Sequence, residues 1–121
     1  MVSGNVNVFV YGTLLRGEIN HAELEGARFL REARTEPAFE LVDLGEYPAM
    51  VCGGATAVHG ELYAVPPALL AALDAFEGHP AFYRRSRIRL DDGRWAEAYV
   101  LPPQLGEGKP RLAGGSWRAR C

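Results

Sequence analysis

An apolar run that stops at a glycine-bounded loop, in residues 8–17 (VFVYGTLLRG), most constrains how this chain can fold. We expect a strand over residues 6–11 that is apolar on both faces apart from Asn7. Such a strand belongs in the middle of a sheet that is covered on both sides. Because backbone N–H groups that leave a sheet at a turn can face a small anion, the segment predicts a buried strand that leads into a binding loop.

The loop over residues 12–17 also has the GxxxxG spacing of a phosphate-binding P-loop. Glu18 and Ile19 follow it, where a P-loop has lysine and then serine or threonine. We therefore interpret the loop as a nest in which the N–H groups of Gly12, Thr13 and Leu14 bind a carboxylate or an oxyanion. A structural turn with glycines at positive φ is the alternative interpretation.

The remaining segments predict a single α+β domain over residues 1–121 with a mostly antiparallel or mixed sheet. Proline at positions 66 and 67 opens a helix that ends at Gly78, and Leu69, Leu73 and Phe76 form its expected buried stripe. Asp92–Gly93 predicts the turn of a hairpin. Before that helix we expect a short helix capped by Asn20 and ended by Gly26, two strands within residues 27–44, a short strand ending at residue 51 and a strand over 58–65. After it we expect strands over 85–90 and 95–101, and a long loop over 102–115 before a docked Trp117.

Charge and cysteine content narrow the classes of partner. A net charge of −2 and a pI near 5.9 predict no broad field for nucleic acid or an anionic membrane, and we interpret the arginines between residues 84 and 89 as a solvated strand face. Cys52 and Cys121 have no CxxC or metal-ligand spacing, so we expect no metal site. Neither a secretory segment nor a membrane-spanning run is apparent, and we expect a cytoplasmic protein.

Glu77 is the candidate acid–base residue. It ends the predicted helix, where the partial negative charge of the helix disfavours a carboxylate. If Glu77 is also desolvated, its pKa should rise from about 4.3 toward neutrality, as a general base at pH 7 requires. A solvated glutamate at a helix end is the alternative. Asp74, one turn earlier, could be the inward carboxylate instead, although its neighbours favour the helix surface or a place behind the site.

The aromatic residues and histidines give weaker signals. Tyr63, Tyr83 and Trp95 are expected in the core or in a pocket wall. Tyr99 lies on a strand that should adjoin the site, so its phenol could lie beside a ligand. The three histidines fit neither a metal spacing nor a triad with serine.

Two motifs give the chain a resemblance to the γ-glutamylcyclotransferase-like family, especially its γ-glutamylamine cyclotransferases and small bacterial members. VFVYGTLLRGEINH, at residues 8–21, resembles the opening strand and substrate loop of that family. LDAFEGHPAFYRR, at residues 73–85, resembles the segment that carries its catalytic glutamate. VHGELY at residues 58–63 and GSW at 115–117 also match. The resemblance covers nearly the whole chain in order.

The resemblance implies a small barrel-like sheet with a few flanking helices, and an enzyme that needs no metal or organic cofactor. It assigns Glu77 as the catalytic acid/base and places Tyr11, Gly12, Thr13 and Leu14 in the substrate loop. The implied reaction converts a γ-glutamyl amine or γ-glutamyl amino acid to 5-oxoproline by intramolecular aminolysis. The leaving amine and the oligomeric state stay open, as does the group that the loop binds. A non-catalytic module for small molecules on the same scaffold is the alternative, and an RNA-binding barrel is disfavoured by charge.

Overall fold

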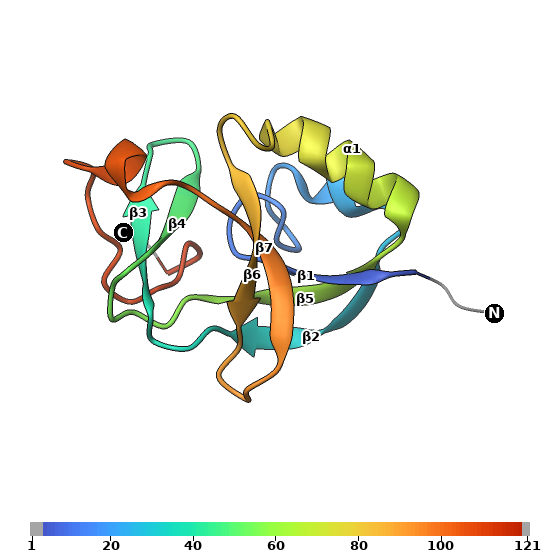
Figure 1. Cartoon of the computed structure of the whole chain (residues 1–121), viewed down its shortest axis with the longest axis horizontal. Helices are drawn as coiled ribbons and strands as arrows, with labels where there is room; N and C mark the ends of the chain where they lie inside the picture. Colours follow the sequence, from blue (N-terminus) through green and yellow to red (C-terminus); the bar gives the residue numbers. More distant parts are fainter. Residues whose placement is uncertain (1–3, 120–121) are drawn as a thin grey trace.

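The first predicted strand lies in the middle of a seven-stranded mixed sheet (Figure 1). The computed structural model describes residues 4–119. Strand β1 (Val6–Val10) pairs antiparallel with β5 (His59–Val65) and parallel with β7 (Trp95–Val100). Residues Val8, Phe9 and Val10 are each at most 3% exposed, which confirms a strand covered on both faces. The strand ends one residue earlier than predicted.

The other elements follow the predicted order, and the α+β class is confirmed. The two strands expected within residues 27–44, the strand near residue 51 and the hairpin around Asp92–Gly93 are all present. The remaining bounds are a 3₁₀ helix η1 (His21–Leu24), β2 (Arg28–Arg34), β3 (Phe39–Asp43), β4 (Pro48–Cys52), α1 (Pro67–Glu77), β6 (Arg84–Arg89) and a 3₁₀ helix η2 (Pro103–Gly106).

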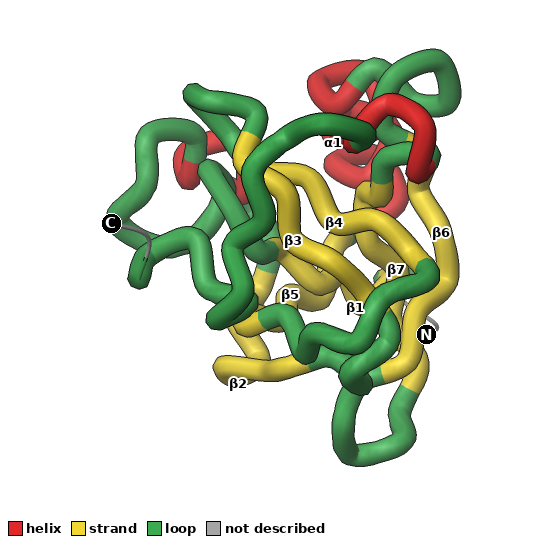
Figure 2. The backbone as a smooth tube through the Cα atoms, turned by 90° about the vertical axis from the view of Figure 1, so that its left-hand side faces the viewer, coloured by secondary structure: helices red, strands yellow, loops and turns green. Residues whose placement is uncertain are grey.

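The resemblance implied a barrel-like sheet, and the sheet that forms is mixed and is not a closed barrel. Its strands follow the order β2-β5-β1-β7-β4-β3, with β6 paired to β7. The ends of β2 and β6 meet only at an isolated bridge between Thr35 and Leu90. One bridge is not a ladder, so within residues 4–119 the sheet keeps open edges. Figure 2 shows the strands gathered in the middle with the helical segments at the periphery.

Helix α1 begins and ends as predicted. Pro66 precedes its first turn, and Gly78 ends it with a φ of 71°, in the left-handed region that favours glycine. The predicted stripe was wrong in part: Leu70 and Leu73 are buried, whereas Phe76 is 41% exposed. Leu70 and Leu73 pack into the core cluster with residues of the sheet. Phe76 lies in the last turn of the helix, where its side chain lines a pocket.

Three local predictions need correction. Asn20 stands at the N-cap position of the short helix, which is a 3₁₀ helix, but its side chain makes no capping hydrogen bond and donates instead to the Thr13 hydroxyl (3.0 Å). Trp95 is 49% exposed between the guanidinium groups of Arg87 and Arg89, and is not in the core. Arg85 leaves the solvated arginine face to pair with Asp74.

Other predictions about single residues came out as follows. Trp117 is docked, with 2% exposure. Cys52 is an exposed free thiol, and Cys121 lies outside the described residues. The helices within residues 4–119 are all too short or too polar to cross a membrane.

Candidate functional site

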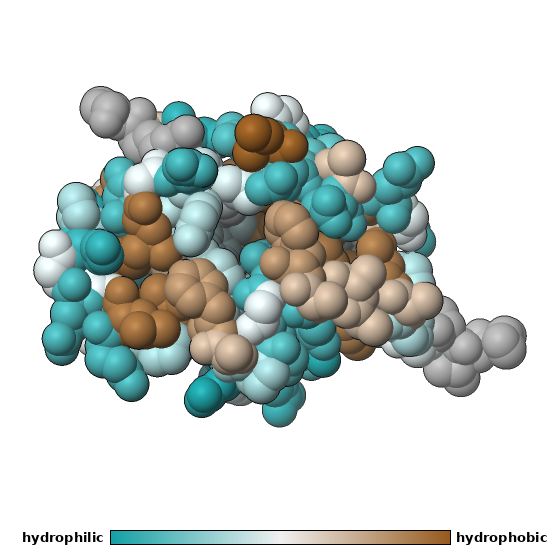
Figure 3. All heavy atoms as spheres, turned by 90° about the horizontal axis from the view of Figure 1, so that it is seen from above, coloured by the Kyte–Doolittle hydropathy of each residue, from teal (hydrophilic) through white to brown (hydrophobic). Residues whose placement is uncertain are grey.

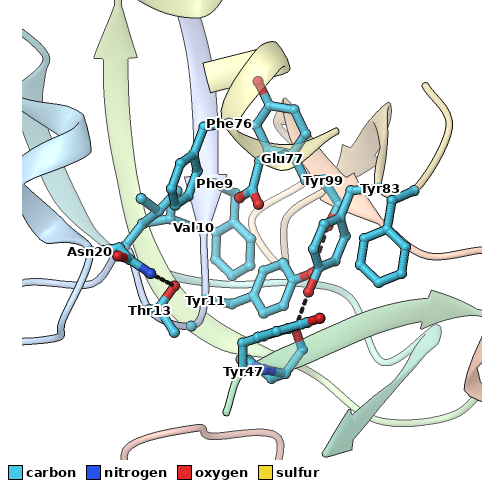
Figure 4. Close-up of a pocket in the computed structure, with 14 residues that line it drawn as sticks. Phe9, Val10, Tyr11, Thr13, Asn20, Tyr47, Phe76, Glu77, Tyr83 and Tyr99 are labelled. Carbon is cyan, nitrogen blue, oxygen red and sulfur yellow. Dashed lines mark hydrogen bonds between the residues drawn. The ribbon is translucent and has the colours of Figure 1, made fainter. Parts of the chain in front are cut away.

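The loop after β1 and the end of α1 meet at a pocket of about 290 Å³ (Figure 4). The segments that lead into β4 and β6 form its other side, and Tyr99 comes from β7. The cavity is therefore lined from four parts of the chain, within residues 9–20, 47–48, 76–83 and 99. The lining residues are Phe9, Val10, Tyr11, Gly12, Thr13, Leu14, Asn20, Tyr47, Pro48, Phe76, Glu77, Phe82, Tyr83 and Tyr99. All six residues singled out from the sequence, Tyr11, Gly12, Thr13, Leu14, Glu77 and Tyr99, therefore lie around the same cavity.

Glu77 places a desolvated carboxyl group in this pocket. Figure 4 shows the carboxyl pointing into the space that the labelled side chains enclose. Burial raises the pKa of Glu77 from 4.5 to about 7. Within residues 4–119, no hydrogen bond or ion pair offsets this burial. A carboxyl with such a pKa can both accept and return a proton near neutral pH.

The loop after β1 is held in a fixed shape by its own carbonyl groups. The N–H of Leu15 donates to Gly12 O (3.1 Å), and the N–H of Asn20 donates to Thr13 O (2.9 Å). The His21 ring donates to Leu14 O at 2.9 Å. Among these bonds within the described part of the chain, none is donated by the N–H of Thr13 or Leu14. The loop therefore keeps backbone donors beside the pocket, as a nest requires.

Gly12 is required by a close approach of two chain segments. A Cβ atom at this position would lie 2.6 Å from Cγ of Pro48 and 2.7 Å from its Cδ. Pro48 is the first residue of β4 and also lines the pocket. The absence of a side chain at Gly12 thus allows the loop to lie directly against β4, and this close contact narrows the cavity. Any larger residue at position 12 would separate these two walls.

Three buried tyrosines form rigid walls. Tyr11 donates to Tyr99 O (2.6 Å) and accepts the N–H of Met50 (3.0 Å), and Tyr83 donates to Pro48 O (2.5 Å). Tyr99 lines the pocket, but its hydroxyl donates to Asp74 (2.7 Å). Burial raises the pKa of all three phenols well above the ordinary value of 10. They stay neutral, and their hydroxyls are committed to the protein.

Asp74 lies behind the site. Its carboxylate accepts from Arg85 (Nε to Oδ1, 2.8 Å) and from Tyr99, and Arg85 also pairs with Glu97. Burial alone would raise the pKa of Asp74, but these hydrogen bonds outweigh it and the pKa is lowered. Asp74 is therefore ionised and fully engaged. Of the two acids that the sequence left open, Glu77 is the one in the pocket, and Asp74 supports its wall.

The sequence interpretation missed several wall residues. Asn20, Tyr47 and Phe82 line the pocket, and Phe76 does so although it was expected in the core. Tyr47 and Phe82 come from connections between elements, where no periodicity marks a residue as inward-facing. The available signal was membership of a motif, because Phe76 and Phe82 lie within residues 73–85 and Asn20 lies within residues 8–21. Tyr47 lies in neither motif.

The described residues hold no cluster of three or more His, Cys, Asp or Glu side chains suited to a metal ion. In the pocket, Glu77 is the one carboxylate among the described lining residues. The arrangement can transfer a proton and bind an anion through backbone donors. It supplies the parts for acid–base chemistry on a small molecule.

Comparison with known proteins gives consistent matches over nearly the whole chain. The sequence model of the family described as "Gamma-glutamyl cyclotransferase, AIG2-like" matches residues 8–119. A protein of Vibrio cholerae serotype O1, assigned by its name to the gamma-glutamylcyclotransferases, is 45% identical over 114 residues, which cover 93% of this chain and 96% of that protein. The human gamma-glutamylaminecyclotransferase is 41% identical over 92 residues, covering 69% of this chain and 60% of the human protein.

A solved structure shares the fold. The crystal structure of an aig2-like protein from Mus musculus superimposes with a TM-score of 0.79 at 28% identity. The match covers 90% of this chain and 86% of the mouse chain.

Proposed function

Because the chain belongs to the AIG2-like gamma-glutamyl cyclotransferase family, we propose that it converts a γ-glutamyl amine or γ-glutamyl amino acid into 5-oxoproline and a free amine. One observation carries the proposal: an unpaired carboxyl with a pKa near 7 shares a small cavity with the loop over residues 11–14. This reaction needs a proton acceptor and fixed donors, and it needs little else.

The substrate brings its own nucleophile. Its α-amine attacks its γ-carbonyl carbon, so a C–N bond forms within one molecule and closes a five-membered lactam. Because the two groups are tethered, their effective concentration is high once the substrate is held in a folded shape. The amide bond to the leaving nitrogen then breaks, with no water consumed.

Glu77 moves the protons. In its ionised form it takes a proton from the α-ammonium group, which frees the lone pair for attack. It then returns that proton to the departing nitrogen as the C–N bond breaks, which restores the carboxylate. The attacking nitrogen still carries one proton more than the lactam keeps, and Glu77 passes this proton to the released amine, which leaves as an ammonium ion. One group can serve as base and then as acid because its pKa is close to the working pH.

The loop over residues 11–14 binds negative charge. Either the α-carboxylate of the substrate or the oxygen that becomes an oxyanion during attack can accept from the N–H groups of Thr13 and Leu14. The side chains of Thr13 and Asn20, joined by a hydrogen bond of 3.0 Å, add neutral donors at the same wall.

The test is a panel of γ-glutamyl compounds scored by mass spectrometry for 5-oxoproline, with the wild-type protein and Glu77→Gln. Glutamine keeps the shape and removes the base, so we expect turnover to fall at least ~100-fold while substrate still binds. Glu107→Gln, at an exposed position outside the pocket, is the matched control and should retain full turnover. Near-normal turnover in Glu77→Gln would refute the role of Glu77. Tight binding without any release of 5-oxoproline by the wild type would favour a binding module.

A further inference from the structure

One side of the pocket mouth is a cluster of three aromatic rings that the proposed chemistry does not use. The rings of Phe82 and Tyr83 lie 5.0 Å apart at 83°, and the Tyr47 ring lies 6.4 Å from each of them. Tyr83 is buried, whereas Tyr47 and Phe82 are 40% and 38% exposed. Figure 3 looks down on the side of the molecule where α1 and these connections lie, and it shows apolar side chains gathered there between hydrophilic ones.

The cluster is continuous with the reactive part of the cavity. The same pocket contains Glu77, and Phe76, 41% exposed, lines it from the last turn of α1. Partly exposed rings at the mouth of a pocket gain from an apolar partner that removes their surface from water. A γ-glutamyl group bound at the loop and at Glu77 would send its amine substituent toward this mouth.

The charge of the walls restricts what that substituent can be. Among the described residues that line the pocket there is no lysine, arginine or histidine, and Glu77 is the one group that carries charge at neutral pH. A carboxylate on the leaving amine would lose hydration without gaining a cation, and it would lie near Glu77. A cationic substituent would find its one charged partner in Glu77, and an ion pair there would occupy the carboxyl that must take and return the proton. An uncharged apolar substituent has neither of these unfavourable effects, and it excludes water from the Glu77 carboxyl.

We infer that Tyr47, Phe82 and Tyr83 form a subsite for the leaving amine that selects an uncharged, apolar substituent. The inference rests on the proposed function and specifies its substrate class: γ-glutamyl amides of aryl-alkyl or alkyl amines, in preference to γ-glutamyl amino acids or diamines. Phe76 closes the opposite side of the same mouth.

Matched substrate pairs test the subsite. γ-Glutamyl-phenethylamide and γ-glutamyl-phenylalanine have the same ring and differ by one carboxylate. γ-Glutamyl-hexylamide and γ-glutamyl-cadaverine have the same length and differ by a terminal methyl or ammonium group. In each pair we expect kcat/KM for the uncharged member to be at least about 10-fold higher, since an unpaired charge is placed against apolar walls.

Two variants of Phe82, at the pocket mouth, test whether the aromatic rings cause this substrate preference. Phe82→Ala should raise KM for the phenethylamide by about 5- to 10-fold, with a smaller change in kcat, because contact area is lost and the reacting groups are intact. Phe82→Leu keeps an apolar side chain and should recover part of the loss. Trp95→Ala, at an exposed aromatic outside the pocket, is the control and should change neither constant.

The outcomes separate the inference from the proposed function. Release of 5-oxoproline with equal rates within each pair, or with faster turnover of the charged member, overturns the subsite and leaves the proposed function standing. If no compound yields 5-oxoproline, the proposed function fails. Calorimetric titration of Glu77→Gln then decides about the rings: a Kd at least about 10-fold lower for the phenethylamide than for γ-glutamyl-phenylalanine supports an apolar binding site, and equal values overturn it.

Discussion

Glu61 and Glu77 are two acids removed from water in opposite ways. Glu61, in β5, is 0% exposed and accepts four hydrogen bonds: from the N–H and Nε of Arg16 (both 3.0 Å), from Tyr63 (3.0 Å) and from Arg118 (3.2 Å). Glu77 is partly buried, and nothing in the described chain donates to its carboxyl. The Glu61 carboxylate is therefore fully hydrogen-bonded, whereas the Glu77 carboxyl has no donor within the described chain.

The difference sets the charge state and the role of each acid. Burial alone would raise the pKa of Glu61, but the hydrogen bonds from Arg16, Tyr63 and Arg118 outweigh it, and the pKa is lowered. Burial without donors raises the pKa of Glu77 to about 7. A buried carboxylate with full partners is a structural link, here between β5, the loop after β1 and the C-terminal segment. One without partners is less stable but can exchange protons.

The largest expected effect is on the pH dependence of turnover. In the proposed mechanism Glu77 acts in its ionised form. We therefore expect kcat/KM to fall about tenfold per pH unit below the Glu77 pKa of about 7, or about 100-fold between the alkaline plateau and pH 5. Glu61, with its lowered pKa, stays ionised over that range and adds nothing to the profile. Steady-state kinetics from pH 5 to 9 measure the effect.

A direct titration of the free protein separates the ionisation of Glu77 from any ionisation of the substrate that contributes to the pH profile. Carboxyl ¹³C NMR of the free protein should give one glutamate midpoint near 7, absent in Glu77→Gln. A profile that stays flat down to pH 5, or a Glu77 midpoint at the usual value, would remove the contrast between the two acids.

These two acids also mark the limit of what the sequence could predict. The end of α1 at Glu77 was predictable because Gly78 is a local signal. The hairpin and the central strand likewise follow from residues close together in the chain. The identity of Glu77 as the pocket acid was approached through the resemblance, but its desolvation depends on segments distant in the sequence that line the same pocket, such as those carrying Tyr11 and Tyr47.

Glu61 had no local signal. The period-2 pattern of residues 58–65 places it beside Tyr63 on one face, where a glutamate is usually solvated. Its partners Arg16 and Arg118 lie 45 and 57 residues away, so only the folded chain brings them together. The failure of the sheet to close has the same origin, because it depends on how the ends of β2 and β6 meet.

The second prediction removes the charge of Glu61. In Glu61→Gln, several donors lose their charged acceptor at a buried position. We therefore expect the free energy of unfolding to fall by about 2–3 kcal/mol at pH 7. Urea unfolding measures the change. The matched control is Glu32→Gln: Glu32 also pairs with Arg16 (3.6 Å), but its side chain is 78% exposed, so the change should stay within about 0.5 kcal/mol. Equal effects at the two positions would show that burial and full pairing of Glu61 are unimportant.

The third prediction has the opposite sign. The folded-state pKa of Glu77 lies above its unfolded value of about 4.5, so ionising Glu77 costs stability as the pH rises from about 4.5 to about 7. Glu77→Gln avoids that cost and should be more stable than the wild type by about 1 kcal/mol at pH 8, a figure reduced for the residual solvent contact of the carboxyl. The gain should disappear below about pH 4.5. Thermal or urea unfolding at pH 4 and 8 tests both parts, and a less stable variant at pH 8 would mean that Glu77 has a stabilising partner.

The smallest effect concerns the longest of the four hydrogen bonds to Glu61. Arg118, with a side chain 41% exposed, donates to Glu61 at 3.2 Å and also to the carbonyl of Arg16. Arg118→Gln should cost about 0.5 kcal/mol and less at high salt, since an ion pair open to solvent contributes little and Glu61 keeps its three other donors. A double-mutant cycle with Glu61→Gln measures the coupling. A loss as large as that of Glu61→Gln itself would mean that a solvent-facing residue balances most of the buried charge, and the number of donors would no longer explain why the pKa of Glu61 is lowered while that of Glu77 is raised.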